Sequence, residues 1–134
     1  MSHLLDSSAW LAHLFGEPGV DEINILFNDP NTQVSISALS IPEVFARLKV
    51  IGRETHWADV WAIYSELFFR VIEADEAIAH RAVQLRAATP KRLPTIDGLI
   101  AATALLRRLT LVHCDPHMAA IADSKLRQMH LPNK

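Results

Sequence analysis

The chain has 134 residues, half of them hydrophobic, and a formal net charge of -2 at pH 7. That length and apolar content suit one domain whose core needs no disulfide or structural metal. The lone cysteine, Cys114, excludes an intrachain disulfide and fits a reducing compartment, so we expect a cytoplasmic protein. We expect neither export nor a membrane span, because the sequence has no leader pattern and no run of about 18 apolar residues.

Short strand patterns and amphipathic helix patterns alternate along the chain. An apolar run at residues 3–5 ends at Asp6-Ser7-Ser8, which is typical of a short strand followed by a helix N-cap. The helix after this cap ends at Gly16. Further strands are predicted at residues 34–37, 71–72 and 109–112. Further helices are predicted at residues 20–27, 41–51, 56–69, 76–88, 96–106 and 118–129.

Two helix starts carry capping signals. The segment Ser40-Ile41-Pro42-Glu43 combines an N-cap serine, a first-turn proline and a glutamate three residues after the cap. Thr95 is the expected cap of the most apolar helix, after a loop at residues 89–94. No repeat or linker divides residues 1–134, so a single domain is expected. Alternating strands and helices predict an α/β fold, in which helices cover both faces of a small parallel sheet of about four or five strands.

Four acidic residues from distant segments are expected at one edge of this sheet. Asp6 and Asp115 follow predicted strands, and ligands bind beyond the carboxyl ends of strands in open parallel sheets. Asp97 and Glu43 lie in the first turns of predicted helices, which begin at that same edge. Close carboxylates repel and raise each other's pKa unless a cation neutralises them. Oxygen ligands suit Mg²⁺ or Mn²⁺, which activate water against a phosphodiester, so we predict a metal-dependent nuclease.

Each of these acids also has a purely structural interpretation. Glu43 would complete a capping box with Ser40. Asp97 suits the helix dipole in any case. Asp6, before two serines, and Asp115, before a proline, would serve as cap or turn residues. It is their combination, in this chain order and after short strands, that favours a shared site.

The chain carries four motifs in order, LLDSS at residues 4–8, SIPEV at 40–44, DGLIAATA at 97–104 and LVHCD at 111–115. Together they resemble the PIN-domain family, particularly its VapC-like toxins, and the similarity spans nearly the whole chain. The resemblance implies an endoribonuclease toxin of a type II toxin–antitoxin system, dependent on Mg²⁺ or Mn²⁺, which cuts RNA and so inhibits growth or translation. It also implies a cognate antitoxin as partner, and a homodimer.

The same resemblance implies a catalytic metal site formed by Asp6, Glu43, Asp97 and Asp115. Asp6 and Asp97 would be direct ligands. Glu43 would be a ligand or a base that orients water, and Asp115 a ligand that binds directly or through water. Ser7 would support Asp6 by hydrogen bonding, or would act as a helix N-cap.

Two histidines depart from the family pattern. Members commonly have Thr or Ser where His113 stands, and often an acid where His117 stands. Either histidine could bind metal, although a loop histidine is more often polar surface. If His117 replaces an acid, the site holds less negative charge and a single metal is expected.

The charge is unevenly distributed along the chain. Residues 1–46 hold six acidic residues and no Lys or Arg, whereas residues 47–134 hold thirteen basic and nine acidic residues, a formal +4. This permits a polyanionic partner, although basic pairs more often mark a solvated helix face. Arg86, Lys91 and Arg92, near the acidic rim, are the candidates for contacts to RNA phosphates.

Aromatic residues have mainly structural interpretations. Trp57, Trp61, Leu67 and Phe68 have the spacing of an amphipathic helix, which favours a core or partner-facing role over base stacking. Trp10, one turn after Asp6, fits either the core or the rim of the site.

Two other classes of protein compete with a nuclease. A non-catalytic PIN-like module that binds RNA or protein would bind RNA without cutting it in Mn²⁺. A phosphoacceptor signalling domain would need adjacent acids after its first strand and a lysine after a late strand. The pair Asp6-Ser7 and the absence of lysine between Arg92 and Asp123 argue against that second class.

Overall fold

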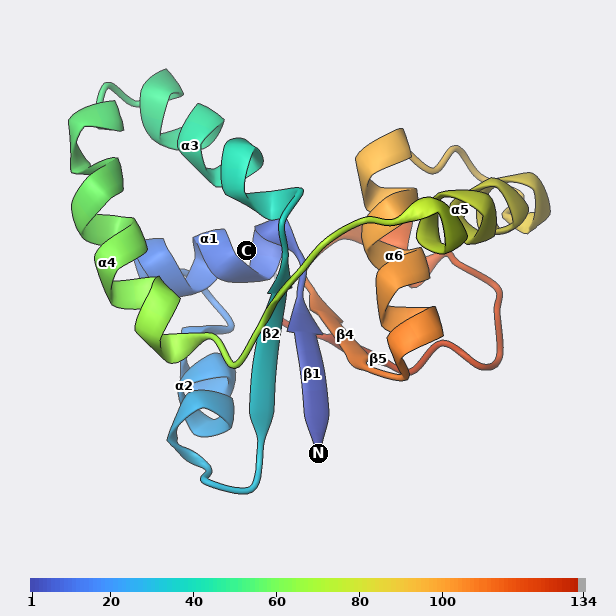
Figure 1. The fold of residues 1–134 in the computed structure, drawn as a ribbon, viewed down its shortest axis with the longest axis horizontal. Coiled ribbons are helices and arrows are strands. Elements are labelled where there is room, and N and C mark those ends of the chain that lie inside the picture. Colours follow the sequence, from blue (N-terminus) through green and yellow to red (C-terminus); the bar gives the residue numbers. More distant parts are fainter. Residues whose placement is uncertain (133–134) are drawn as a thin grey trace.

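A five-stranded parallel sheet forms the centre of the computed structural model, which describes residues 1–132 (Figure 1). The strand order is β3-β2-β1-β4-β5, and every pairing is parallel. The α/β fold expected from alternating strands and helices is therefore confirmed. The strands are β1 (Ser2–Leu5), β2 (Gln33–Ser37), β3 (Val71–Ile72), β4 (Thr110–His113) and β5 (Gln128–His130).

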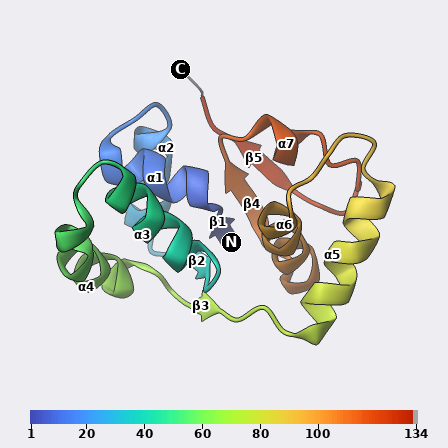
Figure 2. The same ribbon diagram turned by 90° about the horizontal axis from the view of Figure 1, so that it is seen from above.

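Helices cover both faces of this sheet, as predicted (Figure 2). Four helices lie on one face: α1 (Ser7–Phe15), α2 (Val20–Asn28), α3 (Ser40–Val50) and α4 (Trp57–Leu67). Three lie on the other: α5 (Glu76–Ala88), α6 (Thr95–Arg107) and the short α7 (Pro116–Ala119). None of the helices within residues 1–132 has the length and apolarity that a bilayer crossing requires.

The central strand β1 supplies both hydrophobic cores. Successive side chains of a strand point to opposite faces, so Leu4 and Leu5 enter different layers. Leu4 packs with Leu111 and the residues of α5 and α6, whereas Leu5 packs with Val112 and the residues of α1 to α4. This alternation holds β1 and β4 between two helical layers, and so sets the positions of Asp6 and Asp115 beyond the ends of these strands.

Trp10 belongs to the core, which resolves its ambiguous position in the sequence. Its side chain is fully buried, and its ring centroid lies 5.2 Å from that of Phe68 and 6.2 Å from those of Trp57 and Trp61. The core interpretation of these aromatic residues is therefore confirmed. Leu67, from the same predicted group, stays 41% exposed.

The chain after β4 differs from the helix predicted at residues 118–129. Helix α7 ends at Ala119, and β5 occupies the end of the segment instead. Asp123 makes a tight turn, in which its Oδ1 accepts from the backbone N–H of Lys125 (2.9 Å) and its Oδ2 accepts from Arg81 (2.7 Å). Pairing with the open edge of β4 outweighs the local helix propensity of this segment.

The caps predicted at Ser40 and Thr95 and one helix boundary were wrong in detail, whereas the N-cap predicted at the start of α1 is confirmed with Asp6. Thr95 begins α6 and Pro94 precedes it, with no side-chain cap. Ser40 likewise begins α3 without capping it, so the capping box with Glu43 does not form. The helix predicted at residues 56–69 is a 3₁₀ turn (Glu54–His56) followed by α4, because Phe68 is already extended and leads into β3.

Candidate functional site

The four predicted acids all lie at the carboxyl edge of the sheet. Asp6 directly follows β1, and Asp115 lies two residues beyond β4, the strand paired with β1. Glu43 lies in the first turn of α3, which follows β2, the other neighbour of β1. Asp97 lies in the first turn of α6, whose far end leads into β4. The parallel topology thus brings together residues separated by more than a hundred positions.

Asp6 is the most buried of these acids, with a relative exposure of 3%. It caps α1 by accepting a hydrogen bond at Oδ1 from the Ala9 N–H (2.8 Å), and the Ser8 hydroxyl donates to the same oxygen (2.7 Å). Its pKa is raised to about 7, chiefly by burial and also by the charges of Asp115 and Asp97, against the lowering effect of these two hydrogen bonds. The structural role as N-cap and a shared acidic site therefore coexist in this residue.

Asp97 and Asp115 are close neighbours. One side-chain ligand atom from each, together with a ring nitrogen of His117, lies within 4.8 Å of the others. Burial raises the pKa of Asp97 to about 6, and the negative charges of Asp115 and Glu43 add to the effect. Asp97 therefore interacts electrostatically with each of the other three acids, whereas in the described part of the chain only Asp97, Asp115 and His117 lie within 4.8 Å of one another.

Glu43 is held by Ser7, not by a capping box. The Ser7 hydroxyl donates to Glu43 Oε1 at 2.5 Å and lies 3.0 Å from the Ser40 hydroxyl. The prediction that Ser7 supports Asp6 was therefore wrong, because Ser8 makes that contact. The sequence does contain the signal that identifies Ser8: a serine two residues after an N-cap aspartate lies within reach of its carboxylate.

His113 and His117 occupy different surroundings. His113 is fully buried; its Nδ1 accepts from the Asp115 N–H (3.1 Å) and its Nε2 lies 2.8 Å from Gln128 Oε1. Both ring nitrogens are engaged, which disfavours His113 as a metal ligand. His117 is exposed on α7 with Nδ1 3.2 Å from Asp115 Oδ1, beside the acids. Gln128 was missed because its segment was predicted to be helical.

The candidate phosphate contacts lie on α5 and in the loop before α6. Lys91 and Arg92 are exposed in the loop before α6. Arg86 donates from Nε to the Leu93 carbonyl (2.9 Å), and its aliphatic carbons pack on Gly98. A Cβ added at Gly98 would lie 3.1 Å from Cγ and Cδ of Arg86. Arg86 thus supports the loop that leads to Asp97, while its role in RNA binding stays a prediction.

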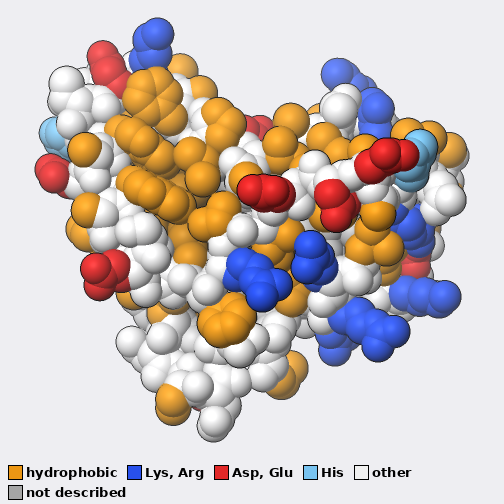
Figure 3. All heavy atoms as spheres, viewed as in Figure 1, with side chains coloured by type: hydrophobic (Ala, Val, Ile, Leu, Met, Phe, Trp, Pro, Cys, Tyr) orange, Lys and Arg blue, Asp and Glu red, His pale blue; other side chains and the backbone are white. Residues whose placement is uncertain are grey.

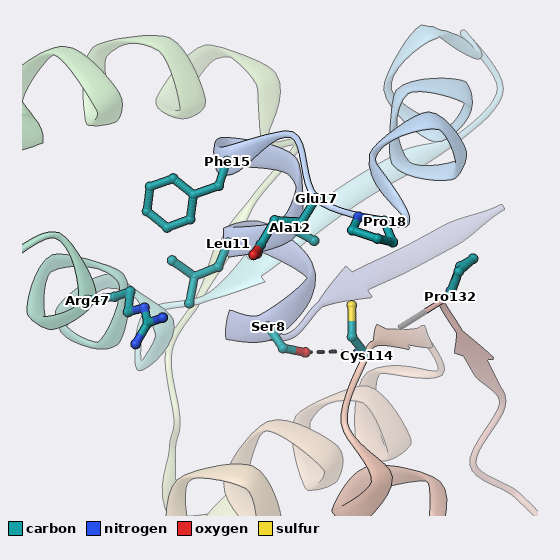
Figure 4. Close-up of a pocket in the computed structure, with 9 residues that line it drawn as sticks. All are labelled: Ser8, Leu11, Ala12, Phe15, Glu17, Pro18, Arg47, Cys114 and Pro132. Atoms are coloured by element: carbon teal, nitrogen blue, oxygen red, sulfur yellow. Dashed lines mark hydrogen bonds between the residues drawn. The ribbon is translucent and has the colours of Figure 1, made fainter. Parts of the chain in front are cut away.

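An apolar pocket adjoins the acidic site. In Figure 3 hydrophobic side chains gather over the side of the molecule formed by α3 and α4. A pocket of about 320 Å³ runs from Leu11 and Phe15 of α1 to Arg47 of α3, and Ser8 and Cys114 form its boundary (Figure 4). The Ser8 hydroxyl accepts from the Cys114 N–H (3.0 Å) there, so one serine joins the pocket, the end of β4 and Asp6.

The donor set fits a divalent cation. Carboxylate oxygens are the ligands that Mg²⁺ and Mn²⁺ prefer, and an imidazole such as His117 is compatible with Mn²⁺. Burial, and to a smaller extent the neighbouring acidic charges, raises the pKa of Asp6 and Asp97, and a bound dication would favour the ionised form of both. These features define an α/β protein with an acidic candidate metal site beyond the carboxyl ends of its central strands.

Sequence comparison places the chain in a family. The model of the PIN domain matches residues 3–124, so the chain belongs to the PIN domain family. The matched segment contains all four acids. A search of curated protein sequences finds no match.

Solved structures of toxin–antitoxin proteins share the fold. VapBC2 from Rickettsia felis, bound to a promoter DNA fragment, aligns with a TM-score of 0.80 and 16% identity over 98% of this chain and 100% of that one. A toxin–antitoxin complex from Klebsiella pneumoniae aligns with a TM-score of 0.66 and 26% identity, over 93% of this chain and 98% of that one. VapC20 from Mycobacterium tuberculosis, a toxin that cleaves the sarcin–ricin loop, aligns with a TM-score of 0.72 and 14% identity, over 95% of this chain and 99% of that one.

Proposed function

We propose that this chain is the toxin of a type II toxin–antitoxin system and that it cuts RNA in a reaction dependent on Mg²⁺ or Mn²⁺. The observation that carries the proposal is the convergence of Asp6, Glu43, Asp97 and Asp115 on one edge of the sheet, where two of them have a raised pKa. Such a concentration of acids destabilises the chain unless a cation binds them. Membership of the PIN domain family supports the assignment.

We infer a different role in metal binding or water positioning for each acid from its surroundings. Asp6 uses Oδ1 for its two hydrogen bonds, and Oδ2 makes none within residues 1–132, so Oδ2 is the proposed ligand atom. Asp97 is the second direct ligand, and Asp115 binds directly or through water. Glu43, oriented by Ser7, is a ligand or positions the attacking water. A bound dication would supply Lewis-acid activation of that water and neutralise charge on the phosphodiester.

A cognate antitoxin is the proposed protein partner. The structural neighbours include toxin–antitoxin complexes, and the K. pneumoniae complex is 26% identical to this chain. The pocket between α1 and α3 offers apolar surface next to the acids (Figure 4). A homodimer remains a prediction, to be checked by sedimentation of the purified chain.

The test compares two aspartates at the same helical position. Asp97 is the third residue of α6, and Asp59 is the third residue of α4 but is exposed and remote from the acids. Wild-type protein and Asp59→Asn should cleave total RNA in Mn²⁺ and not in EDTA, whereas Asp97→Asn should lose at least a hundredfold of the rate. Expression of the first two should halt growth of the host.

An unimpaired Asp97→Asn enzyme would refute the site. RNA binding by the wild-type chain without cleavage in Mn²⁺, at high protein concentration, would instead support a non-catalytic PIN-like module.

A further inference from the structure

Basic residues gather at the amino edge of the sheet, opposite the acids. Arg70 directly precedes β3 and Arg127 directly precedes β5, while Arg107 is the last residue of α6 and Arg108 follows it on the way to β4. Because all five strands are parallel, their starting ends share one edge. On the face drawn in Figure 3, several Lys and Arg side chains lie close together. We call this set, with Lys125, the basic amino edge.

Two adjoining pockets lie along the basic amino edge. The larger, of about 560 Å³, is lined by Arg108, Lys125 and Arg127 over a floor that includes Leu109. The second, of about 300 Å³, is also lined by Leu109 and includes Arg70 and Arg107. Neither set of lining residues contains an acid. The two pockets therefore form one extended strip of positive charge.

The cations of this strip are largely available to a ligand. Arg81, at the border of the larger pocket, is neutralised by Asp123 (2.7 Å). Within residues 1–132, no acid forms an ion pair with Arg70, Arg107 or Arg127. Arg127 instead donates from Nη2 to the carbonyl of Arg108 (2.7 Å).

That backbone contact orders the strip. Arg108 ends α6 in the left-handed conformation (φ 58°), which is uncommon for a residue other than glycine. The Arg127 guanidinium holds the carbonyl of Arg108, so Arg108 and Arg127 are positioned before any ligand binds.

The pKa of the buried His3 is affected by a cation of this strip. His3 on β1 is 7% exposed, and its pKa is lowered first by burial and then by the positive charges of the N-terminal ammonium and Arg127. Of the strip residues, Arg127 thus contributes positive potential at β1.

We propose that the basic amino edge binds the phosphate backbone of single-stranded RNA, as a second contact remote from the acidic site. The inference rests on the proposed function, since it concerns the RNA cut at the opposite edge. Arg and Lys contact phosphates without reading sequence. Helix α6 has 13 residues and so is about 20 Å long. In a base-stacked strand with a rise of about 3.4 Å per nucleotide, roughly six nucleotides span this length.

RNA fits this strip better than an acidic amphipathic peptide does. A peptide helix would need a broad apolar seat. The large hydrophobic residues that line these two pockets and are also exposed are Leu106 in the larger and Phe69 in the second. Arg or Lys side chains line both pockets, whereas each pocket has, among residues 1–132, only one large hydrophobic lining residue that is exposed.

The test compares two pairs of substitutions with the same change in charge. Arg107→Gln/Lys125→Gln removes one Arg and one Lys from the strip, and Lys49→Gln/Arg53→Gln removes one of each from the exposed end of α3 and its following turn. Both pairs are made in Asp97→Asn protein. Binding of a fluorescent 20-nucleotide single-stranded RNA is measured by anisotropy in EDTA, so binding is assessed independently of metal-dependent cleavage, which tests the proposed function.

We expect the Arg107/Lys125 pair to weaken binding about tenfold and to reduce the slope of log K against log salt by about 1.4, from two lost phosphate contacts. The Lys49/Arg53 pair should stay within twofold. Equal effects of the two pairs, or no effect of the first, would overturn the proposal. So would tighter binding of duplex DNA or polyglutamate than of RNA to the strip.

Discussion

The backbone N–H of Asp115 donates to Nδ1 of His113 across 3.1 Å. Because Nδ1 accepts, the proton of the neutral ring lies on Nε2, where it donates to Oε1 of Gln128 (2.8 Å). Burial lowers the pKa of His113, which favours this neutral form. Gln128 of β5 therefore holds the His113 ring, and this ring in turn holds the turn that carries Asp115. In this way β5 supports the acidic site without contacting it.

His113→Leu should weaken Mn²⁺ binding about tenfold, because the turn that carries Asp115 loses its acceptor. His113→Asn should recover most of the affinity, since its amide oxygen can take the place of Nδ1. His130→Leu is the control, because the His130 ring stacks on that of His113 with centroids 4.9 Å apart and lies on β5, away from the turn that carries Asp115. Isothermal titration with Mn²⁺ measures all three. Equal losses for the Leu and Asn variants would mean that His113 only fills space.

Ser7 and Ser8 should have different effects on the pH dependence of metal binding. Ser8 donates to Asp6 and lowers its pKa, whereas Ser7 donates to Glu43. Ser8→Ala should therefore shift the pH of half-maximal Mn²⁺ affinity upward by about one unit, the size expected for a lost hydrogen bond to a charged group. Ser7→Ala should weaken binding without that shift. A pH series of Mn²⁺ titrations distinguishes them, and the same shift in both variants would contradict the assignment.

Much of the fold could be predicted because its signals are local. The alternation at residues 34–37 identifies a strand and the apolar stripe from Ile96 identifies a helix, each from neighbouring residues alone. The final strand could not be predicted in this way. Residues 118–129 contain helix-forming residues, and only the unpaired edge of β4, which is a tertiary feature, selects a strand there.

The candidate site also contains residues that could be predicted from the sequence and residues that could not. Asp6, Glu43, Asp97 and Asp115 could be predicted to converge because parallel topology dictates where strands end and helices begin. Their supporting contacts could not, because Ser8 and Gln128 are selected by distances between segments far apart in sequence. The sequence likewise indicates excess basic charge after residue 46 but not its placement along one edge.

Trp10 should dominate the stability of the aromatic layer. Trp10→Ala should lower the free energy of unfolding by about 3–5 kcal/mol, because it leaves a large cavity among Phe68, Trp57 and Trp61. Trp10→Phe should cost clearly less, since the buried Nε1 has no hydrogen-bond partner within residues 1–132 and its removal relieves that loss. Urea unfolding measures both; Trp61→Ala, at a half-buried site, should fall between them.

Asp6 and Asp97 make the metal-free fold sensitive to pH. Their pKa values of about 7 and about 6 in the folded chain stand above the ordinary 3.8 of an unfolded aspartate. The folded chain therefore binds more protons than the unfolded chain between about pH 4 and pH 7. Stability from these groups is present below pH 4 and is lost as the pH rises through 6 and 7.

Mn²⁺ should consequently stabilise the protein more at pH 8 than at pH 5.5. At pH 8 both carboxyl groups are ionised, so they repel each other in EDTA and bind the cation when it is added; at pH 5.5 protons compete with it. Thermal unfolding with and without Mn²⁺ at the two pH values provides the measurement. Asp6→Asn/Asp97→Asn should abolish both the stabilisation and its pH dependence, whereas Asp59→Asn should preserve them. A stabilisation by Mn²⁺ that is equal at both pH values in the unsubstituted chain would show that these two carboxyl groups do not bind the ion.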